Sequence, residues 1–153
     1  MINLLSAEDA FTKAVQLYNK HDFGACVPYF LHAIRNIPKG DFHTNEYLGF
    51  YGLCLIRLGN RDEGFNKCLI AAEGELKNPE VFAILARAAI TMSRRRIAIK
   101  AISQGLMIES GYAKLINLRN ELGIRRDPMF SFLSRDNFFN ILLGKLIYKL
   151  SHY

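Results

Sequence analysis

Cysteine and histidine are the residues of this chain whose chemistry suits metal binding or nucleophilic attack, and it has three of the first and four of the second. They are Cys26, Cys54, Cys68, His21, His32, His43 and His152. A zinc site needs pairs of ligands a few residues apart, and these residues do not show that spacing. All three cysteines fall in apolar stretches with helical periodicity, where a reduced thiol packs as a small core side chain. We expect free thiols and no metal site.

The sequence lacks the usual catalytic motifs. It contains no glycine-rich phosphate loop, no nucleophile elbow and no pair of carboxylates flanked by histidine. We therefore expect a protein that is not an enzyme and that needs no cofactor.

Arginines form the other chemically distinctive group. The basic patch that they suggest consists of Arg94, Arg95, Arg96, Arg125 and Arg126. Residues 94–153 hold 11 Lys and Arg against 4 Asp and Glu, whereas residues 1–93 hold 9 against 10. Nucleic-acid binding usually adds exposed aromatic side chains or a recognition helix, and neither accompanies the three consecutive arginines. We expect solvated charge at a turn, with contact to anionic lipid or nucleic acid as the alternative.

Length and composition favour one folded unit. The chain has 153 residues, of which 50% are hydrophobic and 22% charged, with only 4 prolines. No run approaches the roughly 18 apolar residues of a membrane-spanning helix, and the first residues turn acidic before an apolar signal segment could form. We expect a cytoplasmic protein, with peripheral attachment at the inner membrane surface as an alternative.

Apolar residues recur at helical spacing between short polar breaks, which predicts antiparallel helix pairs. The pairs cover about 6–38, 44–78 and 79–110, and a capping helix covers 111–123. Ser6, and Asn78 followed by Pro79, have the residue types of helix starts. Gly123 has that of a left-handed helix end.

A repeat of 34 residues relates the second pair to the third. Three pairs of small residues have this separation: Gly52 and Ala86, Gly59 and Ser93, and Ala71 and Gly105. About four extra residues, around 39–43, separate the first pair from the second. A period of 34 is typical of tandem helix pairs.

The segment 6–110 resembles three tetratricopeptide repeats, because the small residue that lets paired helices approach is matched by Ala14, Gly52 and Ala86. The resemblance implies an all-α, right-handed solenoid of antiparallel helix pairs over 1–123. Residues 124–153 then form a basic linker and a C-terminal amphipathic helix. An unrelated antiparallel helical bundle is the alternative.

The resemblance also implies a concave groove that binds a peptide or helix of another protein. The residues expected to line it are Phe11, Val15, Tyr18, Phe50, Leu53, Arg57, Arg87 and Ile90. The family's clamp for C-terminal carboxylates needs Lys and Asn where Phe11, Val15, Phe50 and Ile84 stand, so chaperone tails are not the expected ligand. We expect an interaction adaptor whose arginines bind acidic groups. The alternative is that these side chains simply pack within the fold.

The predicted C-terminal helix is apolar around most of its circumference. Its docking residues are Phe138, Phe139, Leu142, Leu143, Leu146 and Ile147. Such a helix needs a partner surface. Three remain open: its own solenoid, a second copy or another protein, and a membrane interface.

Two further functions compete with the general adaptor. Small tetratricopeptide chaperones of type III secretion are similar in length and repeat number, although this chain lacks their N-terminal helical extension and adds a basic tail. The other is a scaffold at a membrane or on nucleic acid that uses the basic C-terminal half.

Overall fold

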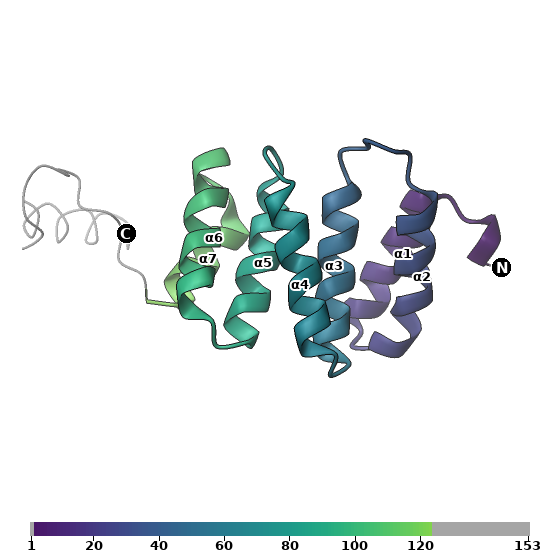
Figure 1. Cartoon of the computed structure of the whole chain (residues 1–153), viewed down its shortest axis with the longest axis horizontal. Coiled ribbons are helices and arrows are strands. Elements are labelled where there is room, and N and C mark those ends of the chain that lie inside the picture. The colour runs from purple at the N-terminus through teal and green to yellow at the C-terminus, as the bar shows by residue number, and fades with distance from the viewer. Residues whose placement is uncertain (1, 124–153) are drawn as a thin grey trace, which may run out of the picture. The chain divides into compact units, whose positions relative to one another are not determined.

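The structure, a computed structural model, describes residues 2–123, and every element in this range is a helix (Figure 1). A 3-10 turn at Ile2–Leu4 precedes seven α-helices. These are α1 (Ala7–Asn19), α2 (Phe23–Asn36), α3 (Thr44–Arg57), α4 (Arg61–Glu73), α5 (Pro79–Thr91), α6 (Arg95–Ile108) and α7 (Ala113–Glu121). Contacts divide the chain into the units Met1–Leu122 and Gly123–Tyr153.

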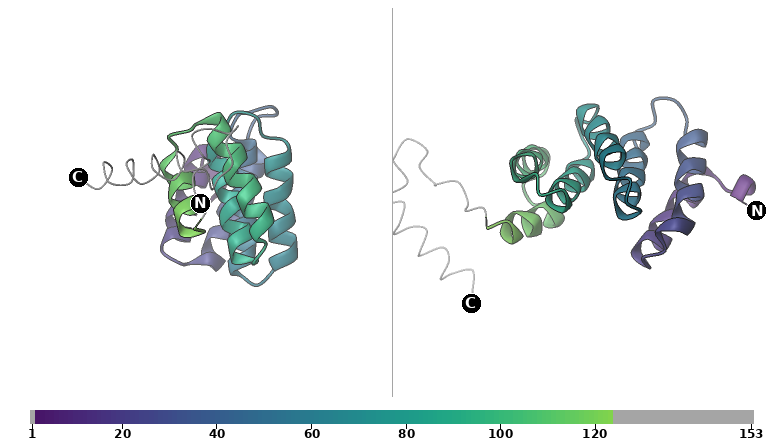
Figure 2. Two further views of the ribbon diagram at one scale, coloured as in Figure 1. Left: turned by 90° about the vertical axis from the view of Figure 1, so that its left-hand side faces the viewer. Right: turned by 60° about the horizontal axis from the view of Figure 1, so that its bottom comes forward.

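Within the first unit, consecutive helices pack as pairs. The pairs are α1 with α2, α3 with α4 and α5 with α6, and α7 packs on both helices of the last pair. Figure 2 shows the second helix of each pair running back along the first. The predicted all-α fold of repeated helix pairs is confirmed. The predicted C-terminal helix lies outside the described residues.

The turn inside each pair has the same backbone geometry in all three pairs. Each turn has three residues, and the middle one has a positive φ: His21 at 63°, Gly59 at 96° and Ser93 at 57°. The residue after it donates its backbone N–H to a carbonyl five residues back, which satisfies a group that the helix end leaves free. Glycine adopts this conformation without strain, so hydrogen bonding must stabilise it at His21 and Ser93.

Two helix starts carry the caps that the sequence predicts. The Asp9 backbone N–H donates to the Ser6 hydroxyl at 3.0 Å, and the hydroxyl donates to the Asp9 carboxylate. The Glu80 backbone N–H donates to the Asn78 side chain, also at 3.0 Å. A cap of this kind contributes about 1 kcal/mol. Gly123 adopts the expected left-handed conformation, with φ of 64°.

Small residues set the spacing inside the pairs. Ala14 and Ala86 are completely buried. A Cβ added at Gly52 would lie 2.6 Å from the backbone oxygen of Gly64 on the facing helix. Only glycine allows α3 and α4 to approach this closely, because any side chain at Gly52 would push the backbones apart.

Candidate functional site

A hollow of about 660 Å³ lies between the first and second helix pairs. The connection from α2 to α3, residues 37–43, has seven residues, whereas the connection from α4 to α5, residues 74–78, has five. The hollow is lined by the chain before α1, the first turns of α1 and α3, the end of α2 and this longer connection. The extra residues therefore coincide with the opening.

Aromatic rings form the floor of the hollow. Phe11 on α1 stacks on Tyr47 on α3 with 4.0 Å between ring centroids and 14° between planes. Phe11 also meets the edge of Phe50 at 5.5 Å, and Tyr47 is only 4% exposed. Stacked and edge-on aromatic pairs each contribute about 1 kcal/mol beyond the area they bury. The floor is consequently part of the core that joins the two helix pairs.

Three carboxylates surround this floor, those of Glu8, Asp41 and Glu46. Burial raises the pKa of the Tyr47 phenol, and the three negative charges raise it further. His43 lies beside them, with Nδ1 3.4 Å from a carboxylate oxygen of Glu46. A half-enclosed site with aromatic and carboxylate groups has the chemistry that binds a cation.

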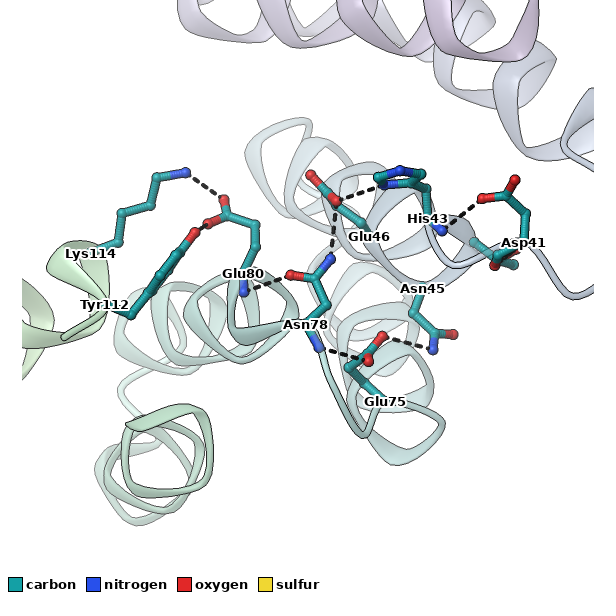
Figure 3. A network of polar contacts seen from close by, with 10 residues as sticks. Asp41, His43, Asn45, Glu46, Glu75, Asn78, Glu80, Tyr112 and Lys114 are labelled. Atoms are coloured by element: carbon teal, nitrogen blue, oxygen red, sulfur yellow. Dashed lines mark hydrogen bonds and ion pairs between the residues drawn. The ribbon is translucent and has the colours of Figure 1, made fainter. Parts of the chain in front are cut away.

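A polar network links the first turns of α3, α5 and α7 (Figure 3). The Asn78 amide donates to the Glu46 carboxylate at 3.1 Å. The Glu80 carboxylate accepts from the Tyr112 hydroxyl and from Lys114, whose Nζ is 2.8 Å away. Glu80 is 8% exposed, and a buried carboxylate is stable only with such partners. These contacts tie each first helix to the next.

Glu75 fixes the connection between α4 and α5. One of its carboxylate oxygens accepts three backbone N–H groups, those of Leu76, Lys77 and Asn78, at 2.7–2.9 Å. The other accepts from the Asn45 amide at 3.1 Å. Burial by itself raises the pKa of Glu75, but these hydrogen bonds favour the ionised form and leave the pKa below its usual value. This loop is therefore held by one charged side chain.

The structure corrects part of the predicted groove. Tyr18, Phe50 and Leu53 are only 8%, 8% and 3% exposed. Phe50 packs against Phe30, with 6.4 Å between ring centroids, and Tyr18 meets the edge of the Phe50 ring. Contacts within the folded unit already occupy these three side chains, so the expectation that they bind a partner is wrong. They join the first helix pair to the second.

The other predicted groove residues have different surroundings. Phe11 is half-buried and is the only one of the predicted set that lines the hollow. Val15, Arg87 and Ile90 are also half-buried, and Arg57 is exposed at the end of α3. Their role in binding stays a prediction.

Two of the three consecutive arginines contact their own chain. The Arg94 guanidinium lies 4.3 Å from the centre of the Phe65 ring and 3.8 Å from the Asp62 carboxylate. Arg95 donates to the backbone oxygen of Leu122 at 2.8 Å. Arg96 is exposed. Most of this run therefore packs the turn between α5 and α6 and the end of α7.

The remaining predicted residues lie outside the described range. They are Arg125 and Arg126 of the basic patch, and Phe138, Phe139, Leu142, Leu143, Leu146 and Ile147 of the C-terminal helix.

Sequence reasoning missed the carboxylates of the hollow and the polar network. A signal for the network was available, because Glu46, Glu80 and Lys114 are each 34 residues apart, as are Asn78 and Tyr112. Polar residues recurring with the helical repeat at helix starts indicate contacts between repeats. Glu8 belongs to the same series once the four extra residues are counted.

Neither a metal cluster nor a membrane-spanning helix is found in the range 2–123. No three His, Cys, Asp or Glu side chains there are grouped as ligands, and no helix there is long and apolar enough to cross a bilayer. No model of a known protein family matches the chain, and a search of curated proteins finds no significant match.

Proposed function

We propose that this chain is a non-catalytic adaptor of the tetratricopeptide type that binds a peptide segment of a partner protein. The binding site is the hollow between α1 and α3. The observation that carries the proposal is the 660 Å³ opening at the one connection between helix pairs that has seven residues. Ligand sites of this kind are concave and combine an apolar floor with a few polar groups.

Repetition of detailed contacts supports the family. The positive-φ residues of the three turns are separated by 38 and 34 residues, which is one period plus four and then one period. The polar network repeats with the same period of 34. Coincidence of backbone geometry and side-chain contacts at one period favours tandem repeats over an unrelated bundle.

The chemistry of the hollow favours a basic side chain of the peptide. Lys114 shows how such a group binds here, because its ammonium lies 2.8 Å from the carboxylate of Glu80. Glu8 stands at the corresponding position of the first helix, and no side-chain hydrogen bond joins it to residues 2–123. A lysine or arginine of a partner would pair with Glu8 and Glu46 above the Phe11 ring.

Selection of random displayed peptides on the full chain tests the proposal. We expect the selected peptides to be enriched in lysine or arginine. Their affinity, measured by fluorescence anisotropy with synthetic copies, should fall roughly tenfold or more when Glu8 and Glu46 are both changed to Gln, as expected for loss of an ion pair worth 1–2 kcal/mol. Glutamine keeps an acceptor for Asn78, so the fold is retained.

A matched control uses Glu63→Gln with Glu73→Gln, which removes two exposed carboxylates of α4 that do not line the hollow. This variant should bind like the original. Selected acidic peptides would contradict the hollow as the site and point to Arg57 and Arg87 instead. Selection of no peptide at all would contradict the adaptor function.

A further inference from the structure

Two cysteines on neighbouring helix pairs lie in direct contact. The Sγ atoms of Cys26 on α2 and Cys54 on α3 are 2.8 Å apart. Both side chains are completely buried, and both thiols lie 3.2 Å from the backbone oxygen of Phe23. A disulfide has its sulfurs about 2.05 Å apart, so the pair needs to close by less than about 1 Å.

The repeat explains why this contact is particular to the first two pairs. Gly64 and Ala98 stand where Cys26 stands in the later repeats, and Ala88 stands where Cys54 stands. The fold itself therefore needs only a small residue at these positions. Two thiols facing each other go beyond what packing requires.

The thiol pair is polarised. The hydrogen bond from Cys54 lowers the pKa of Cys26, and the same contact raises that of Cys54. Proton sharing of this kind produces one nucleophilic and one protonated sulfur, as in oxidisable dithiols. Cys68 differs, because its only hydrogen bond is to the Gly49 backbone oxygen at 3.5 Å and burial raises its pKa to about 12.

We propose that Cys26 and Cys54 form an oxidisable dithiol, which a peroxide converts to a disulfide joining α2 to α3. The Cys26 thiolate attacks one peroxide oxygen, and the other oxygen leaves and becomes water after taking up a proton. The Cys54 thiol then attacks the sulfenic acid sulfur of Cys26 and releases a second water. Two thiol hydrogens and two electrons pass to the peroxide.

The disulfide would change the mechanics of the unit. In the reduced protein, side-chain packing joins the first helix pair to the second, and their long connection leaves the hollow between them. A covalent bond from α2 to α3 restricts any opening of these pairs, because it closes a loop between residues 28 positions apart. Reduction by a thiol through disulfide exchange restores the original state.

Treatment of the folded full chain with hydrogen peroxide tests the inference. After quenching, free thiols are alkylated and the protein is analysed by intact and peptide mass spectrometry. We expect a product lighter by two hydrogens, with one remaining alkylated thiol at Cys68 and a peptide linkage between Cys26 and Cys54. Treatment with dithiothreitol should return all three thiols.

Single variants separate pairing from burial. Cys68→Ser should still form the linkage, whereas Cys26→Ser and Cys54→Ser should not, although the thiols are equally buried in the original chain. Circular dichroism before and after oxidation shows whether each protein is folded. If a serine variant does not fold, the peptide linkage in the original chain and in Cys68→Ser decides.

Three results would overturn the inference. They are unchanged thiols under conditions that oxidise glutathione, a linkage that involves Cys68, and further oxidation of Cys26 without any linkage. None of them bears on peptide binding, which is measured separately on the reduced protein.

Discussion

The two connections between helix pairs join equivalent elements in different ways. At the first, from α2 to α3, Phe11 meets Phe50, and a hollow opens above the rings. At the second, from α4 to α5, the corresponding contact is Gly49 with Ile84, where an added Cβ would lie 3.1 Å from the isoleucine. The first connection has seven residues and the second has five.

The difference shows how one repeat gives either a packed joint or a site. Replacing a ring by glycine lets the next helix approach, and Glu75 then fixes the shorter connection with four hydrogen bonds. A ring at the same position fills space that glycine leaves empty, and the longer connection leaves polar groups around an opening. Four substitutions test this comparison.

The largest effect is expected when the first joint's residue is placed in the second. Gly49→Phe would force a ring into space that Ile84 occupies, so the free energy of unfolding should fall by about 3 kcal/mol. Urea denaturation measures it. Gly24→Phe on α2 is the control, because nothing lies within 4 Å of a Cβ there. Equal losses for the two variants would show that the close approach at Gly49 is unimportant.

Removal of the Glu75 side chain should have the next largest effect. Glu75→Ala leaves three backbone N–H groups and the Asn45 amide without their acceptor, which should cost about 2 kcal/mol. Glu109→Ala is the control, since Glu109 is exposed and stands 34 residues further on. A loss no greater than that of the control would contradict the role of Glu75.

The effect of Glu75 should depend on pH. Because its pKa is lowered in the folded state, its contribution is complete well above the ordinary value of 4.5 and is lost as pH falls through the folded pKa. The difference in unfolding free energy between the original chain and Glu75→Ala should therefore narrow in acid. A difference that stays constant from neutral to strongly acidic pH would refute this.

A smaller effect is expected at the end of the polar network. Tyr112→Phe removes one of the two donors to the buried Glu80 carboxylate, which should cost about 1 kcal/mol. Thermal unfolding measures it. Tyr29→Phe on α2 is the control, because no hydrogen bond joins the Tyr29 hydroxyl to residues 2–123. A similar shift in both variants would remove the network from the account of stability.

The smallest effect on stability is expected at the hollow. Glu8 is exposed and Glu8→Gln should change the unfolding free energy by no more than about 0.5 kcal/mol. A large loss would mean that the carboxylate supports the fold, in which case its part in binding could not be read from the variant.

Much of the fold could be predicted from local patterns. Apolar periodicity and the caps at Ser6 and Asn78 predict the helices to within a few residues, and the spacing of Gly52 and Ala86 predicts their repetition. These features depend on residues close in sequence or on one fixed period. The first joint could not be predicted in this way, because it depends on how far seven connecting residues separate two packed pairs.

The sequence by itself determined that this chain forms paired helices with small residues at their contacts and buried cysteines. Only the tertiary structure decided that Tyr18, Phe50 and Leu53 belong to the core, that carboxylates surround a hollow beside Phe11, and that Cys26 meets Cys54. Periodicity gives the face of a helix on which a side chain lies. Whether that face is covered depends on the distance to the next pair, which packing across the whole unit sets.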